Sequence, residues 1–171
     1  MKVVVFNGSP RKNGDTAKMT SVFREAAENA GHDVKVFDVA NMNINGCKGC
    51  EYCHQKSDGV CIQRDDMDLM YDDLREAEVL ILASPIYYFA MSGQIQTALN
   101  RTYCIGKFPK LKKLGMILSS HDSKAFGACK AQYDDLCRYL ELESAGFITS
   151  HQEEHGTEAK LAEVTQMAQN L

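Results

Sequence analysis

Segments with strand and helix patterns alternate along this chain, and the alternation restricts its fold more than any other feature. Lys2 begins a run of apolar, β-branched residues that ends at Phe6 and shows no regular polar positions. A strand that is apolar on both sides is typical of a parallel sheet covered on both faces. Further strands are predicted at Asp33–Phe37, Leu80–Ala83, Leu114–Leu118 and Ala145–Thr149.

Apolar residues at helical spacing lie between these strands. We expect the first helix to have its capping position at Thr16 and to end at Gly31. Further helices are predicted at about Met67–Arg75, Ser92–Tyr103, Ala128–Leu140 and Thr157–Gln169. This alternation predicts an α/β fold, a doubly wound five-stranded parallel sheet with helices on both faces. The expected strand order is the flavodoxin-like 2-1-3-4-5, which places ligands at the carboxyl ends of the strands.

Length and composition narrow the class of protein. The 171 residues fit one domain over residues 1–171, with a cysteine-rich insertion at about residues 41–65. A net charge of −4 argues against a nucleic-acid partner. No apolar run reaches the length of a membrane span, and Met1 leads directly into a strand, so we expect no membrane partner and no export signal. Seven cysteines then indicate a reducing, cytoplasmic location, where clustered thiols serve metal or redox chemistry.

The loop after the first strand, Gly8–Thr16, has the features of an anion site. Its glycines, Gly14 among them, let successive backbone N–H groups face one anion at a helix start. Ser9 and Thr16 can donate hydroxyl hydrogen bonds, and Arg11 can supply positive charge. The loop is neither a nucleoside-triphosphate loop nor a dinucleotide fingerprint. It predicts a site for a terminal phosphate monoester, and a polar turn before a capped helix is the alternative.

The loop expected after the third strand, Ser84–Gly93, holds three consecutive aromatic residues, Tyr87, Tyr88 and Phe89. Three such side chains cannot all turn into the core, so we expect at least one to offer a surface to a flat ring. A local hydrophobic cluster or a dimer contact is the alternative. A phosphate site and a ring site at one sheet edge describe a mononucleotide with a large flat base, for which FMN is the obvious candidate.

The two loops together resemble the NADPH-dependent FMN reductase family, whose members have the flavodoxin-like fold. The resemblance rests on Gly-Ser-Pro-Arg…Asn-Gly…Thr at residues 8–16, on Ser-Pro-Ile-Tyr at residues 84–87, and on Met-Ser-Gly at residues 91–93. It implies that the first loop holds the FMN phosphate and that the second lies along the flavin ring, with a third contact from the loop after the fourth strand. The FMN-binding residues it implies are Ser9, Arg11, Asn13, Gly14, Thr16, Pro85, Ile86, Tyr87, Tyr88 and Ser119.

The insertion carries Cys47, Cys50, Cys53 and Cys61 at the spacing C-x2-C-x2-C-x7-C. Thiolates at every third residue can wrap one cubane, with a fourth ligand from slightly downstream, whereas zinc sites more often use two separated pairs. The pattern also resembles the iron–sulfur flavoprotein branch of the family, which implies a [4Fe–4S] cluster on these cysteines. Structural or redox-active thiols and a zinc site are the alternatives. Because the insertion follows the second strand, we expect it at the ligand edge of the sheet. Cys104 is interpreted as a small buried hydrophobe.

These features predict an FMN-dependent oxidoreductase. Reduced nicotinamide (NADH or NADPH) or reduced ferredoxin would supply electrons. The acceptor would be a quinone, another flavin, a nitro or azo compound, oxygen, or a protein. We assign no catalytic side chain, because the flavin carries the chemistry. The resemblance also implies a homodimer or homotetramer. The alternatives are a non-enzymatic flavodoxin-like electron carrier and a redox sensor that acts through its cysteines.

Overall fold

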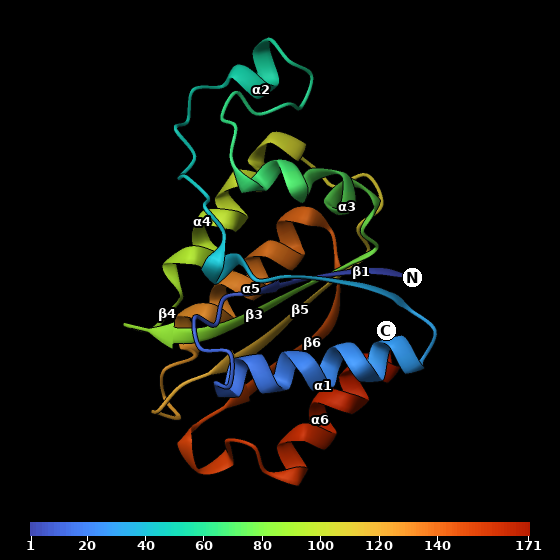
Figure 1. Ribbon diagram of the computed structural model, residues 1–171, viewed down its shortest axis with the longest axis vertical. Helices are drawn as coiled ribbons and strands as arrows, with labels where there is room; N and C mark the ends of the chain where they lie inside the picture. Colours follow the sequence, from blue (N-terminus) through green and yellow to red (C-terminus); the bar gives the residue numbers. More distant parts are fainter.

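Five parallel strands in the order β2-β1-β3-β5-β6 form the centre of the computed structural model, which describes residues 1–171 (Figure 1). This order confirms the predicted arrangement, with a short antiparallel strand, β4, added beside β3. The strands are β1 (Lys2–Asn7), β2 (Asp33–Phe37), β3 (Val79–Tyr87), β4 (Ala90–Met91), β5 (Lys113–Ser119) and β6 (Glu143–Ser150).

The apolar run in β1 is explained by two separate cores. Val4 and Phe6 face one hydrophobic cluster, whereas Val3 and Val5 face the other, and all four are fully buried. Alternate side chains of a strand point to opposite faces, so a strand in the middle of this sheet needs an apolar residue at every position. Complete burial of each such side chain contributes about 1.5–3 kcal/mol.

Two layers of helices enclose the sheet (Figure 1). Helices α1 (Asp15–Asn29) and α6 (Glu158–Gln169) pack on one face. Helices α3 (Tyr71–Glu76), α4 (Gly93–Arg101) and α5 (Gly127–Leu140) pack on the other. The short elements are α2 (Tyr52–Gln55) and the 3-10 turns η1 (Val39–Asn41), η2 (Asp66–Leu69), η3 (Thr102–Ile105) and η4 (Gln152–Glu154). None of the helices has the length and apolar character that crossing a membrane requires.

The predicted start of the first helix is wrong by two residues. Gly14, not Thr16, occupies the capping position of α1, and glycine has no side chain that could cap the helix. Thr16 lies inside the helix, where its hydroxyl pairs with that of Ser119 at 2.6 Å and is therefore already engaged. Gly31 follows the helix with a φ of 86°, as expected for the residue that ends it.

The predicted loop at Ser84–Gly93 also starts too early. Strand β3 continues to Tyr87, and the chain then turns back through Tyr88 and Phe89 into β4. Both turn residues have positive φ, 48° and 65°, as a tight two-residue hairpin requires. Pairing of Ile86 with Met91 buries both side chains, and this burial explains why the strand continues.

The predicted helix at Met67–Arg75 is divided in two. The turn η2 begins after Asp65, whose carboxylate accepts a hydrogen bond from the backbone N–H of Met67, and α3 begins only at Tyr71. The sequence pattern predicted the helical positions. It did not show that Asp65, at the end of the cysteine insertion, caps the first turn as a separate element.

A buried ion pair fixes the cysteine insertion to the rest of the protein. The guanidinium of Arg101, the last residue of α4, donates hydrogen bonds to the carboxylate of Asp65 at 2.5 Å and to the carbonyl of Asn45 at 2.8 Å. Asn45 precedes the cysteines and Asp65 follows them, so one side chain joins both ends of the segment to α4. The two charged side chains are 0% and 1% exposed.

The ion pair strongly favours ionised Asp65. Burial alone would raise the pKa of this carboxyl, but hydrogen bonds from Arg101 and from the backbone of Asn45 and Met67 outweigh burial and lower the pKa to about 2. A lowered pKa in the folded state stabilises the fold above the unfolded pKa of 3.8, and this stabilisation is lost as the pH falls through about 2.

We expect Asp65→Asn to reduce the free energy of unfolding at pH 7 by about 3–5 kcal/mol, because it leaves a buried guanidinium without its anion. As the pH falls from 5 to 2, wild type should lose about 2 kcal/mol more than the variant. Urea unfolding at several pH values measures both quantities. The control is Asp68→Asn, which breaks an exposed pair with Arg64 and should change stability by less than about 1 kcal/mol. Equal effects of the two variants would contradict this account.

Candidate functional site

The loop between β1 and α1 is held by its own hydrogen bonds. The hydroxyl of Ser9 donates to the carbonyl of Arg11 at 2.9 Å and accepts from the N–H of Arg11 at 3.3 Å. The N–H of Gly14 donates to the same carbonyl at 3.1 Å. Ser9 is buried, whereas Arg11 and Asn13 are exposed on the outer side of the loop. The loop is thus a fixed turn with a basic side chain free to reach a ligand.

The first turn of α1 offers unpaired donors. The backbone N–H groups of Asp15, Thr16 and Ala17 make no hydrogen bond within the protein, and no side chain caps the helix. Such N–H groups and the positive end of the helix dipole bind anions. These donors and Arg11 fit a phosphate monoester. Thr16 offers its N–H, because its buried hydroxyl is paired with Ser119.

Gly8 brings the loop against the start of α4. A Cβ atom at this position would lie 2.3 Å from Cγ1 of Ile95 and 2.8 Å from the hydroxyl of Ser92, so the approach requires glycine. The hydroxyl of Ser92 donates to the carbonyl of Gly8 at 3.3 Å, and the N–H of Ser92 donates to the hydroxyl of Ser84 at 2.9 Å. The two sequence motifs are therefore joined at one edge of the sheet, as predicted.

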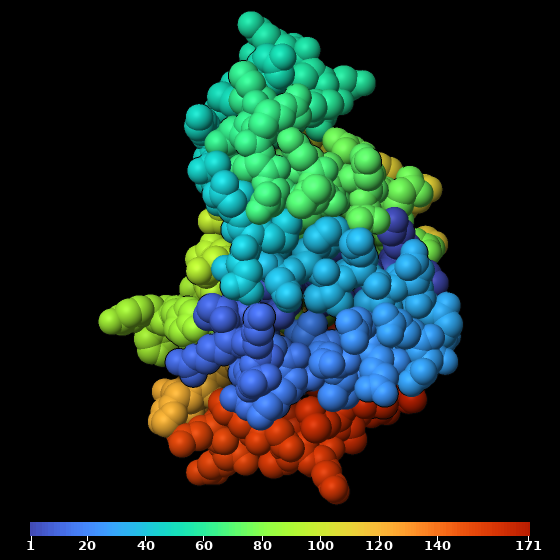
Figure 2. Space-filling view, viewed as in Figure 1, coloured from blue at the N-terminus to red at the C-terminus, as the bar shows by residue number.

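The β3–β4 hairpin exposes its aromatic tip at this edge. Tyr88 is 99% exposed, and its neighbours Tyr87 and Phe89 are also exposed. The hairpin projects from the side of the molecule, on the left in Figure 2. Pro85 is half-buried, whereas the side chain of Ile86 is buried in the core and is not free to contact a ring. Of the residues expected to line a flat ligand, the tyrosines are the accessible ones.

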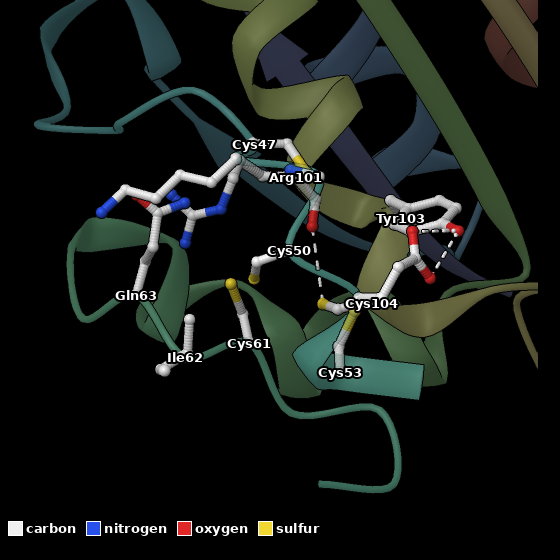
Figure 3. Close-up of a pocket in the computed structure, with 12 residues that line it drawn as sticks. Cys47, Cys50, Cys53, Cys61, Ile62, Gln63, Arg101, Tyr103 and Cys104 are labelled. Carbon is white, nitrogen blue, oxygen red and sulfur yellow. Dashed lines mark hydrogen bonds between the residues drawn. The ribbon is translucent and has the colours of Figure 1, made fainter. Parts of the chain in front are cut away.

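The four predicted metal ligands lie together. Cys47, Cys50, Cys53 and Cys61 are free thiols that line one small cavity (Figure 3). Cys104 of η3 lines the same cavity, so five thiols surround it. As placed, no three of the chain's histidine, cysteine and acidic side chains converge closely enough to hold a metal ion. The donor set, five thiols around one cavity, fits a thiolate-ligated cluster.

Contacts between the insertion and η3 shape this cavity. The hydroxyl of Tyr103 donates to the carboxylate of Glu51 at 3.0 Å, and the ring of Tyr103 packs edge-on against His54 with centroids 4.6 Å apart. Burial raises the pKa of the Cys53 thiol, and the neighbouring Cys104 raises it further. The cavity is therefore formed jointly by the insertion and by η3, the segment that follows α4.

The expected position of the insertion beside the ligand edge is only partly correct. The turn η1, which leads into the insertion, packs against α4, but the cysteines lie at the far end of that helix (Figure 1). The nine residues of α4 span about 13 Å at 1.5 Å per residue. The anion loop lies at the N-terminus of α4 and the thiol cavity at its C-terminus, because Arg101 ties the segment there.

Two residues of the thiol cavity were missed by the sequence analysis. Arg101 was assigned no role, and Cys104 was interpreted only as a buried hydrophobe. Cys104 is indeed buried, but it also faces the four clustered cysteines. A pattern of helical spacing identifies a buried position without showing which cavity that position lines.

Comparison with known proteins identifies the family of this chain. A profile of the NADPH-dependent FMN reductase family matches residues 1–143. An iron-sulfur flavoprotein of Archaeoglobus fulgidus is 40% identical over 112 residues, which cover 66% of this chain and 50% of that protein. The chain spans about half to two thirds of the length of the curated iron-sulfur flavoproteins it matches.

Solved structures support the fold. RosB with a bound riboflavin-phosphate derivative aligns with a TM-score of 0.79 at 14% identity, covering 99% of this chain and 77% of RosB. A flavodoxin from the domain Archaea aligns with a TM-score of 0.63 at 17% identity, covering 99% of this chain and 95% of that flavodoxin. The flavodoxin-like fold is thus confirmed. On the profile match, this chain belongs to the NADPH-dependent FMN reductase family.

Proposed function

We propose that this protein is an FMN-dependent oxidoreductase that takes electrons from a reduced nicotinamide and passes them to a second acceptor. The unpaired N–H groups of the first turn of α1, beside Arg11 and at the same edge as the exposed tyrosines, carry this proposal. Donors for a phosphate and surfaces for a flat ring at one edge match the two ends of FMN. The family description supports the nicotinamide as donor.

The chain's own residues would bind and orient the flavin. Ser9, Asn13, Gly14 and Thr16 form the turn and helix start for the phosphate, with Arg11 as its counter-charge. Pro85, Ile86, Tyr87 and Tyr88 form the hairpin for the ring, in which the tyrosines exclude water and Ile86 supports the hairpin from the core. Ser119 positions Thr16 through the hydrogen bond between their hydroxyls. Bound FMN would supply acceptance of a hydride and delivery of electrons one or two at a time.

We also propose that Cys47, Cys50, Cys53 and Cys61 hold a [4Fe–4S] cluster. Thiolates are the usual ligands of such clusters, and five free thiols line this cavity. The iron-sulfur flavoprotein names of the relatives support the proposal. A cluster would accept electrons singly, which suits either a one-electron acceptor or a ferredoxin donor.

The acceptor is proposed by class only: a quinone, a flavin, a nitro or azo compound, oxygen, or a protein. A homodimer or homotetramer would cover the aromatic tip of the hairpin, whose Tyr88 is otherwise almost wholly in water. A reducing, cytoplasmic location agrees with seven cysteines that form no disulfide.

For the flavin site, we expect Arg11→Ala to raise the FMN concentration needed for half-maximal NADPH–quinone turnover about tenfold, because a charged hydrogen bond to the phosphate is lost. Riboflavin, which lacks the phosphate, should bind wild type and the Arg11→Ala variant with equal affinity in a fluorescence titration. The control is Arg24→Ala, which removes an exposed arginine of α1 that lies beyond the first turn of that helix. Equal weakening of FMN and riboflavin would contradict the phosphate role of Arg11. Absence of turnover with NADPH and every acceptor would instead indicate an electron carrier.

For the cluster, we expect Cys50→Ser to lower the iron and sulfide content from about four atoms of each per chain, while FMN content stays unchanged. Cys50 is exposed, so its substitution leaves the core intact. The matched control is Cys137→Ser, which lies on α5 outside the cavity and should retain full iron content. Anaerobically purified wild type that contains zinc or no metal would overturn the cluster proposal.

A further inference from the structure

The buried side chain of Arg101 has one N–H donor without a hydrogen-bond partner. Its Nη1 donates to Asp65 and to the carbonyl of Asn45, and its Nη2 lies 3.5 Å from the hydroxyl of Tyr71. Its Nε is also buried but has no hydrogen-bond partner. Buried N–H groups are rarely left unpaired, so an acceptor is expected at this position.

The same side chain lines the thiol cavity, as Figure 3 shows. Arg101 is 1% exposed, and the thiol of Cys104 donates to its backbone carbonyl at 3.4 Å. Burial alone would lower the pKa of Arg101, but the hydrogen bond to Asp65 outweighs this effect and raises the pKa, so the guanidinium stays charged. A fixed cation with one free N–H thus borders the group of cysteines.

We propose that Arg101 is a positioning residue of the cluster site, which donates its free Nε–H to a sulfur atom there and stabilises the reduced cluster by its buried charge. This inference rests on the proposed function, since it requires a cluster on the four cysteines. The net charge around a cluster and the hydrogen bonds to its sulfurs set its reduction potential. Reduction adds one negative charge, so a nearby cation makes reduction more favourable.

The position of the charge makes the effect measurable. Both Arg101 and Asp65 have almost no exposed side-chain surface, so solvent screens neither charge strongly. Arg64, in the same segment, is 67% exposed and therefore screened. Removal of Arg101 and removal of Arg64 change the net charge of the protein equally. Only removal of the buried Arg101 should change the reduction potential of the cluster.

Two variants separate the electrostatic role from a structural one. Arg101→Met removes the cation and leaves the Asp65 carboxylate, so it should lower the reduction potential of the cluster. Asp65→Asn breaks the same ion pair but leaves the cation, so it should raise the potential. If Arg101 only held the segment in place, the two variants would shift the potential in the same direction.

The experiment is an anaerobic redox titration of the full chain, with the reduced cluster followed by electron paramagnetic resonance. At the wild-type midpoint, Arg101→Met should lower the ratio of reduced to oxidised cluster at least tenfold, or about 59 mV for one electron. Arg101→Lys keeps the charge but lacks the Nε–H, so its reduction potential should lie between those of wild type and Arg101→Met. Arg64→Met should have the reduction potential of wild type. Circular dichroism and FMN content establish that each variant is folded.

The outcomes distinguish this inference from the proposed function. Wild type without iron would overturn the cluster itself. Loaded variants with the wild-type potential, or with shifts of one sign for Arg101→Met and Asp65→Asn, would overturn the role of Arg101. If Arg101→Met does not fold or load iron, a raised potential in Asp65→Asn still supports the inference. Loss of iron from both variants, with Arg64→Met fully loaded, would overturn the electrostatic role and leave Arg101 as a structural clamp.

Discussion

The buried pair of Arg101 and Asp65 is the interaction on which the placement of the cysteine insertion depends. The cysteine insertion has little regular structure of its own and few core residues, so its position comes from contacts with α4 and η3. Arg101 fixes Asn45 and Asp65 on either side of the cysteines. Asn45 also donates to Asp65 at 3.0 Å, so the two ends of this segment are joined to each other, and Arg101 attaches the joined ends to α4 beside the thiol cavity.

Helix α4 connects two chemically different candidate sites. At its N-terminus, Ser92 and Ile95 pack on Gly8, and this contact sets the anion loop beside the aromatic hairpin. At its C-terminus, Arg101 borders the thiol cavity. The anion loop relies on backbone N–H groups that the fold provides at a helix start, whereas the cavity relies on side chains from distant parts of the sequence. A rigid helix between them keeps the separation of the two sites constant.

The sequence predicts the sheet well, because a strand such as Val3–Phe6 that is buried on both faces has an unmistakable pattern. The grouping of the four cysteines and the meeting of the two loops at one edge are also predicted. The extension of β3 to Tyr87 depends on burial of Ile86 against Met91, which local patterns do not reveal. Thr16 was misassigned as a cap because its hydroxyl pairs with Ser119, more than a hundred residues away. The role of Arg101 was missed for the same reason, since its partners lie in another segment.

The central proposal is that one chain holds both a flavin and an iron–sulfur cluster. The most direct test is an anaerobic titration of the purified protein with dithionite, followed by absorption across the flavin and cluster bands. The account predicts uptake of about three electrons per chain, two by FMN and one by the cluster. Uptake of about two electrons, with bleaching of the flavin bands only, would contradict the cluster, and protein without flavin absorption would contradict the account as a whole.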